Sequence, residues 1–259
     1  MIILLLGSDQ VWNANLGGLR EVDLLDFCRN EQKISFSASF GINEIPENKK
    51  EFAKSKLQTF KAISVREDAG KQIIEELTNR RDVEVLVDPT MLLTADEWDN
   101  VSKKPQQLNE LKSDKYILNY FLGELPPKWR DEINRIAKEN NCEIINILDK
   151  TSSFYQTGPS EFLYLEKNAF LVCTDSFHSS VFSIIYDTPF VVFNRQQKGV
   201  KSMNSRIDTL LSKFKLEERR FSNEITEDLL KCNYIEAKQI LKQEQEKSIN
   251  FLRKALDIK

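Results

Sequence analysis

The sequence predicts an α/β protein with two Rossmann-like domains, each built on a mostly parallel sheet. Short apolar runs alternate along the chain with segments of helical periodicity, as expected when parallel strands are joined by crossover helices. A polar stretch at 102–114, SKKPQQLNELKSD, interrupts this alternation and contains a proline, which is typical of a linker. We therefore expect an N-terminal domain at 1–104 and a C-terminal domain at 113–259.

The first half of the chain predicts four strands and three helices. The strands are expected at 2–6, 34–38, 62–65 and 83–87, and the helices at 48–60, 67–77 and 95–101. Thr94 precedes the last of these helices and is a suitable N-cap. The six apolar residues at 1–6 are too few for a signal peptide or a membrane span. They predict a buried strand that starts with no lead-in, so we expect the first domain to be incomplete at its N-terminus.

The second half repeats the alternation. A helix predicted at 127–139 starts with two prolines, whose missing amide hydrogens do no harm in a first turn. A last, long charged helix is predicted at 235–256, and its irregular apolar spacing favours packing across both domains. The remaining expected elements are strands 116–122, 143–148, 169–173 and 190–193 and helices 160–167, 176–186 and 205–214.

Composition excludes several classes of protein. The 259 residues carry a formal net charge of −3 with no basic stripe, so nucleic acid is not an expected partner. Four widely spaced cysteines (Cys28, Cys142, Cys173 and Cys232) indicate reduced thiols and a cytoplasmic location. With a single histidine, a histidine-based metal site is not expected. We expect neither a metal nor a cofactor.

The single histidine, His178, stands where a buried strand gives way to a helix. Ligands of parallel sheets bind beyond the carboxyl ends of the strands, and a helix N-terminus favours phosphate or carboxylate groups. An imidazole there can move a proton near neutral pH. The alternative is a histidine that only caps the helix. Asp175 either orients the imidazole or caps the helix itself.

Three arginines also follow predicted strands or begin helices. Arg66 follows strand 62–65, Arg195 follows strand 190–193, and Arg206 opens helix 205–214. Their planar guanidinium groups suit bidentate binding of phosphate or carboxylate. The loop between the last two contains Gly199 and Asn204, and we expect an anion clamp there. The alternatives are an ion pair with a neighbouring carboxylate for Arg66 and surface positions for the other two.

Polar residues after the first strand predict a sugar-binding site. Asp9 and Gln10 can bond hydroxyls, and the face of Trp12 can pack on a sugar ring. The alternative is a tight turn with Trp12 in the core. Asp88 is expected to terminate a strand, and Glu161 to lie in a first helical turn, where its charge suits the helix dipole.

In chain order, the strand-end motifs resemble those of the polysaccharide pyruvyl transferase family. They are Gly7-Ser-Asp-Gln-Val-Trp-Asn13, Phe36-Ser-Ala-Ser-Phe-Gly41, Ile63-Ser-Val-Arg-Glu-Asp68, Val87-Asp-Pro-Thr-Met-Leu-Leu93, Gly158-Pro-Ser-Glu-Phe-Leu163, Thr174-Asp-Ser-Phe-His178, Phe182-Ser-Ile-Ile-Tyr-Asp-Thr-Pro-Phe190 and Met203-Asn-Ser-Arg-Ile207. There are departures. Relatives generally carry a further strand and helix before the first motif, which here starts at residue 7. Some have arginine where this chain has Ser176, and glycine often follows the histidine where this chain has Ser179.

The resemblance implies two domains facing each other across a cleft, as in B-type glycosyltransferases, and transfer of a pyruvyl group from phosphoenolpyruvate to a sugar. The acceptor would belong to a cell-surface polysaccharide or its lipid-linked precursor, in exopolysaccharide and cell-envelope synthesis, with peripheral contact to the membrane face. It implies catalytic roles for His178 and Asp175, donor binding by Arg66, Ser176, Arg195 and Arg206, and acceptor binding by Asp9, Gln10 and Trp12.

Two other functions remain open at this point. A nucleotide-sugar glycosyltransferase on the same fold would use Glu161 to hold the ribose hydroxyls. A catalytically inactive remnant would use the cleft only to bind a glycan, and Ser176 together with the late start of the first motif favours it.

Overall fold

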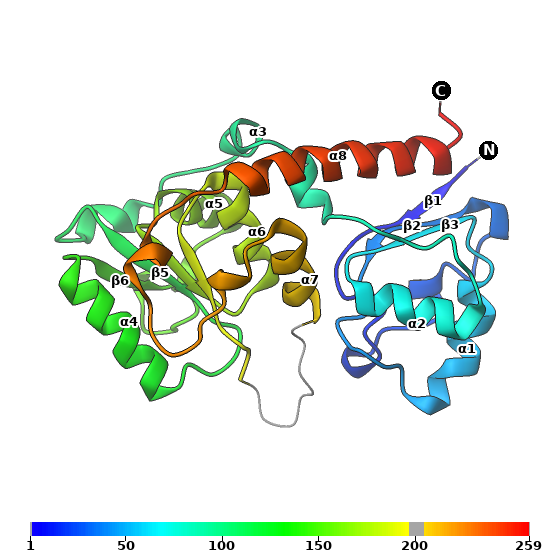
Figure 1. The fold of residues 1–259 in the computed structure, drawn as a ribbon, viewed down its shortest axis with the longest axis horizontal. Helices are drawn as coiled ribbons and strands as arrows, with labels where there is room; N and C mark the ends of the chain where they lie inside the picture. Colours follow the sequence, from blue (N-terminus) through cyan, green and yellow to red (C-terminus); the bar gives the residue numbers. More distant parts are fainter. Residues whose placement is uncertain (1, 197–204, 259) are drawn as a thin grey trace. The chain divides into compact units, whose positions relative to one another are not determined.

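The computed structural model describes residues 2–196 and 205–258. The chain divides into two compact units (Figure 1). Unit 1 comprises Met1–Leu92, Lys201–Lys213 and Ile240–Lys259, and unit 2 comprises Leu93–Val200 and Phe214–Gln239. Two segments beyond the predicted linker are therefore grouped with the first half of the chain.

Unit 1 contains a four-stranded, all-parallel sheet with its strands in chain order. The strands are β1 (Leu4–Leu6), β2 (Lys33–Ala38), β3 (Ala62–Val65) and β4 (Glu84–Val85). The helices of this unit are α1 (Glu47–Leu57), α2 (Asp68–Thr78), most of α7 (Ser205–Phe214) and most of α8 (Ile235–Ala255).

Both faces of this sheet are covered, because its strands are apolar on both sides. On one face, Ile63 and Val65 pack in a core with residues of α1 and α2. On the other, Ile34 and Phe36 pack against the C-terminal part of α8, with the ring of Phe36 stacked on that of Phe251 at 6.3 Å. Burial on both faces is the rule for parallel strands.

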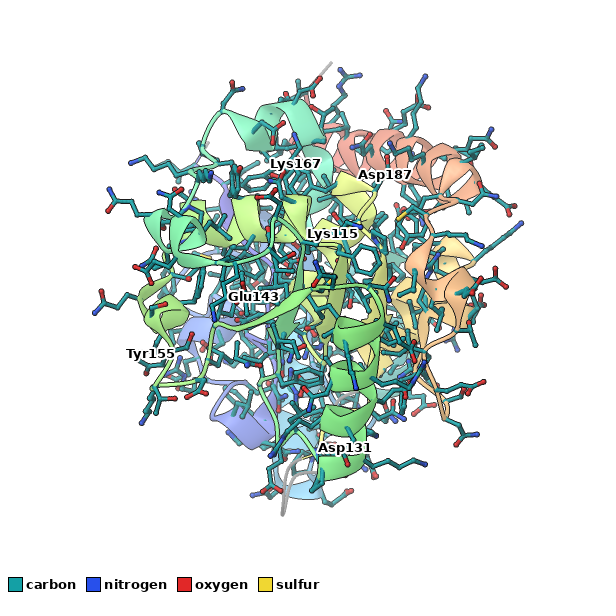
Figure 2. All side chains as sticks on the ribbon, turned by 90° about the vertical axis from the view of Figure 1, so that its left-hand side faces the viewer. Lys115, Asp131, Glu143, Tyr155, Lys167 and Asp187 are labelled. Carbon is teal, nitrogen blue, oxygen red and sulfur yellow. The ribbon has the colours of Figure 1, made fainter. Side chains whose placement is uncertain are left out.

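Unit 2 contains a second four-stranded parallel sheet, in the order β6-β5-β7-β8. The strands are β5 (Tyr116–Tyr120), β6 (Glu143–Asn146), β7 (Leu171–Thr174) and β8 (Phe190–Val192). The helices are α3 (Ala95–Asp99), α4 (Pro127–Glu139), α5 (Pro159–Asn168) and α6 (Phe177–Tyr186). Residues of α4 share one core with Ile117, Leu171 and Val191 of the sheet, while α6 packs on β7 and β8 beside α5. In Figure 2, Lys167 marks the last turn of α5 and Asp187 the end of α6.

The predicted α/β class with parallel sheets is confirmed. Strand 62–65 and helices 127–139 and 205–214 have the predicted bounds, and Thr94 caps α3 as expected. The prediction of a buried first strand is wrong. Since β1 pairs only with β2 among the described residues, it lies at an edge of the sheet, and Ile2 and Leu5 are 75% and 47% exposed. Among the residues that the structure describes, no helix is long and apolar enough to span a membrane.

Candidate functional site

His178 reaches the surface from an otherwise buried helix. Of the ten residues of α6, nine are buried, and His178 is the one that is half-buried. It lies in the first turn, directly beyond the carboxyl end of β7. A short, wholly packed helix thus presents one titratable side chain at the edge of the sheet where parallel-sheet ligands bind.

The residues just before His178 hold this helix and its neighbouring loop. Ser176, not Asp175, is the N-cap: its hydroxyl accepts from the amide of Ser179 at 3.4 Å. Asp175 is 1% exposed, and its two carboxylate oxygens accept from the amides of Leu122 and Gly123, at 2.7 and 2.8 Å. The carboxylate therefore fixes the loop after β5. That it orients the imidazole stays a prediction.

Arg195 closes this end of unit 2. One terminal nitrogen of its guanidinium donates to the Asp175 carbonyl at 3.1 Å, and its Nε lies 3.4 Å from the Asp175 carboxylate. Gly123 has no room for a side chain, since a Cβ there would lie 2.6 Å from the Gln196 carbonyl and 3.0 Å from an Asp175 carboxylate oxygen. The structure thus brings the loops after β5, β7 and β8 into direct contact.

A buried ion-pair cluster lies at the corresponding end of unit 1. The Arg66 side chain is 1% exposed, and its guanidinium donates to Asp88 at 2.9 Å and to Asp9 at 3.3 Å. Asp88 also accepts from the Ser8 hydroxyl at 2.7 Å and from the amide and hydroxyl of Thr90. The strand itself ends at Val85, three residues before Asp88, so Asp88 fixes the turn at Thr90 and neutralises Arg66. The ion pair considered as the alternative for Arg66 is present.

Asp9 and Gln10 differ in exposure. The Asp9 side chain is 69% exposed. Its backbone has φ of 77°, a conformation that non-glycine residues rarely adopt. Gln10 lies beside Arg206: with its amide oriented to satisfy its neighbours, its oxygen accepts from the Arg206 guanidinium at 2.6 and 3.1 Å. The structure therefore joins Asp9 to Arg66 and Gln10 to Arg206 within unit 1.

Trp12 belongs to the core. It is fully buried, its ring lies 5.2 Å from Phe40 and 5.8 Å from Phe60, and its indole N–H donates to the Asp23 carbonyl at 2.8 Å. This is the core position that the sequence left open, and it leaves no ring face for a sugar.

The remaining sequence candidates have other roles or fall outside the described chain. Glu161 accepts from the Gly158 amide at 3.1 Å and so closes the first turn of α5. Gly199 and Asn204 of the predicted anion clamp lie outside the described residues. Within 2–196 and 205–258, no cluster of His, Cys, Asp or Glu is suited to a metal ion. That the polar groups of unit 1 and unit 2 serve one ligand stays a prediction.

Two buried carboxyl groups were not anticipated. Glu67 accepts three hydrogen bonds from the loop after β2. Glu166 is fully buried in α5 and accepts from the hydroxyls of Ser179 and Ser183 on α6. Burial raises the pKa of Glu166 to about 8, against the opposing effect of the two serine hydroxyls. Ser179 and Ser183, spaced by four residues in a mainly apolar helix, were the available signal for Glu166.

Comparison with known proteins bears on this arrangement. A sequence profile described as "Polysaccharide pyruvyl transferase" matches residues 1–197. The chain belongs to the polysaccharide pyruvyl transferase family. Its members are named as transferases. The matched segment includes the residues described above at the strand ends of unit 2 (Asp175, Ser176, His178 and Arg195) and of unit 1 (Asp9, Gln10, Arg66 and Asp88), here called the strand-end clusters, but not Arg206.

Other comparisons of this family member are more distant. Among curated proteins, none matches. A crystal structure of TarM is 13% identical over 91% of this chain and 56% of that chain, with a TM-score of 0.41. A crystal structure of an S. aureus TarM mutant in complex with fondaparinux, alpha-GlcNAc-glycerol and UDP is 12% identical over 93% of this chain and 54% of that chain, with a TM-score of 0.43. The chain spans about half the length of these two proteins.

Proposed function

We propose that this chain transfers a pyruvyl group from phosphoenolpyruvate to a sugar of a cell-surface polysaccharide or its lipid-linked precursor. The reaction takes place in the cytoplasm, at or near the membrane face, without a metal or a cofactor. The observation that carries the proposal is the placement of His178, the one partly exposed residue of a buried helix that begins at the ligand-binding edge of a parallel sheet. Family membership supports the same activity.

The chemistry needs one proton at carbon and a site for two anionic groups. Protonation of C3 of the enol makes C2 electrophilic. One sugar hydroxyl adds to C2 and loses its proton, phosphate leaves with its bonding electrons, and a second hydroxyl adds to C2 and loses its proton. The products are the pyruvate ketal and inorganic phosphate. His178 is a suitable proton carrier because an imidazole can both donate and accept a proton.

The other side chains receive roles that match their surroundings. The N-terminal turn of α6, with Ser176 at its cap, supplies amides and a partial positive charge for the donor. Arg195 and Arg206 provide guanidinium groups for phosphate or carboxylate. Asp9 and Gln10 bind acceptor hydroxyls. Arg66 acts by holding Asp9, because its guanidinium is buried against two carboxylates.

Calorimetric titration of the purified chain with phosphoenolpyruvate tests the proposal. We expect saturable binding that His178→Ala weakens, whereas Asp187→Asn, at the opposite end of α6, leaves it unchanged. Parallel titrations with UDP-sugars distinguish the alternative. Binding of a nucleotide sugar without phosphoenolpyruvate would assign the chain to glycosyl transfer, and glycan binding without either donor would identify it as a binding module.

A further inference from the structure

The Glu67 carboxylate is hydrogen-bonded to the loop after β2. It follows Arg66, precedes α2 and is fully buried. Although it occupies the N-cap position of α2, its side chain makes no capping bond to that helix. Instead one carboxylate oxygen accepts from three donors of the loop after β2: the Ser39 hydroxyl at 3.1 Å, the Phe40 amide at 2.8 Å and the Gly41 amide at 3.0 Å.

This loop lies against Gln10, a proposed ligand-binding residue. Gly41 has φ of 61°, which disfavours a side chain, and a Cβ there would lie 2.7 Å from the end of the Gln10 amide. With the Gln10 amide oriented so that its oxygen faces Arg206, this oxygen accepts from both terminal nitrogens of the guanidinium. A continuous series of contacts therefore runs from the Glu67 carboxylate through Gly41 and Gln10 to the Arg206 guanidinium.

Unit 2 contains a corresponding arrangement, in which a carboxylate after one strand accepts from amides of the loop after the neighbouring strand. Asp175 follows β7 and accepts from the amides of Leu122 and Gly123, in the loop after the neighbouring parallel strand β5. Glu67 follows β3 and accepts from amides in the loop after the neighbouring parallel strand β2. In both loops a Cβ on the glycine would lie within 3.0 Å of a neighbouring atom. Because this arrangement occurs in both units, we take the carboxylate to hold the loops at the ligand-binding edge of each sheet.

We infer that Glu67 is a positioning residue for the proposed transfer reaction: by fixing the Ser39–Gly41 loop it places Gln10 and Arg206 for ligand binding. This inference rests on the proposed function. Three donors converge on one carboxylate oxygen, and hydrogen bonds to a carboxylate are stronger than bonds to an amide oxygen. Replacing Glu67 with glutamine removes the charge and keeps the shape of the side chain. The Ser39–Gly41 loop should therefore loosen without a cavity forming in the core.

The test is calorimetric titration of phosphoenolpyruvate into wild type and Glu67→Gln. We expect about a tenfold increase in Kd, because weaker loop bonds let the proposed Arg206 contact fluctuate. Glu76→Gln, which removes an exposed carboxylate from the same helix, should bind like wild type. Ser39→Ala removes one of the three donors and should weaken binding in the same direction. Its matched control is Ser35→Ala, a buried β2 serine whose hydroxyl bonds to the Ser64 carbonyl instead.

A second readout follows the loop itself. The Trp12 amide donates to the Ser39 carbonyl at 3.1 Å, and its ring packs on Phe40. With 5-fluorotryptophan incorporated, the fluorine resonance of Trp12 should shift or broaden in Glu67→Gln, while those of Trp98 and Trp129, both in unit 2, stay in place. A general loss of structure would disturb all three.

The outcomes separate the two proposals. If wild type binds no phosphoenolpyruvate, the proposed function fails and the inference fails with it. If wild type binds and both Glu67→Gln and Ser39→Ala keep its affinity, only the inference is overturned. Should Glu67→Gln not fold, Ser39→Ala against Ser35→Ala decides the question. Equal losses in that pair would mean that the loop bonds are merely structural.

Discussion

Glu166 makes the stability of unit 2 depend on pH in the direction opposite to that of most carboxyl groups. Its side chain is fully buried between α5 and α6, and burial raises its pKa from the ordinary 4.5 to about 8, although the hydroxyls of Ser179 and Ser183 oppose the shift. The folded chain therefore holds a proton that the unfolded chain releases above pH 4.5.

The sign and size of the effect follow from this difference. Between about pH 4.5 and 8 the folded state binds one more proton than the unfolded state, so raising the pH destabilises the fold. The free energy of unfolding should fall by about 1.4 kcal/mol for each pH unit in this window, or about 5 kcal/mol in all. Burial, the largest cause in each case, raises the pKa values of Tyr116, Tyr120 and Tyr186 above 10.0, so these tyrosines do not titrate there.

Glu166→Gln isolates the contribution. The glutamine amide keeps an oxygen for one serine hydroxyl and cannot ionise. The free energy of unfolding of the variant should therefore lack the pH dependence that Glu166 causes. We expect the variant to match wild type near pH 5 and to exceed it by several kcal/mol near pH 8. Urea unfolding followed by circular dichroism at pH 5, 6, 7, 8 and 9 measures both proteins.

Glu161→Gln provides a control for the loss of one carboxyl group from the same helix. If the difference between wild type and Glu166→Gln stays constant from pH 5 to 9, the buried carboxyl group does not change its protonation on folding. The reasoning from burial to pKa would then be refuted. Because Ser179 directly follows His178, ionisation of Glu166 should also loosen the helix that carries the histidine.

Three further predictions concern the strand-end clusters. His178→Ala should lower pyruvyl transfer by about 10²–10⁴-fold in an activity assay while urea unfolding stays close to wild type, and full retained activity would exclude a catalytic role. Gly123→Ala should destabilise the chain by about 1–3 kcal/mol through overpacking. Its control is Gly7→Ala, which should change little because nothing lies within 4 Å of a Cβ there. Equal midpoints of urea unfolding would contradict the close approach of Gly123 to the Gln196 carbonyl. Arg66→Ala should cost about 3–5 kcal/mol by leaving a buried carboxylate unpaired, far more than Asp9→Ala at an exposed position, and similar losses in urea unfolding would argue against the buried pair.

The sequence by itself determined the elements and the edge of the sheet where the candidate site lies. Apolar periodicity and the proline pair set the bounds of α4, and the change from apolar to hydroxyl residues marked the end of β7 and the start of α6. These signals are local, since capping, proline geometry and side-chain period act within a few residues. The family motifs are local too, and so could be recognised along one chain.

Tertiary structure alone decided which of these residues are exposed and what they bond. Trp12 is a core residue, Arg66 is enclosed by two carboxylates, and β1 is an edge strand. Glu67 and Glu166 look like ordinary helix charges in the sequence, yet both are buried acceptors for groups of another loop or helix. The physical reason is that burial and hydrogen bonding depend on which strands and helices meet, and the local pattern of one segment does not specify its partner.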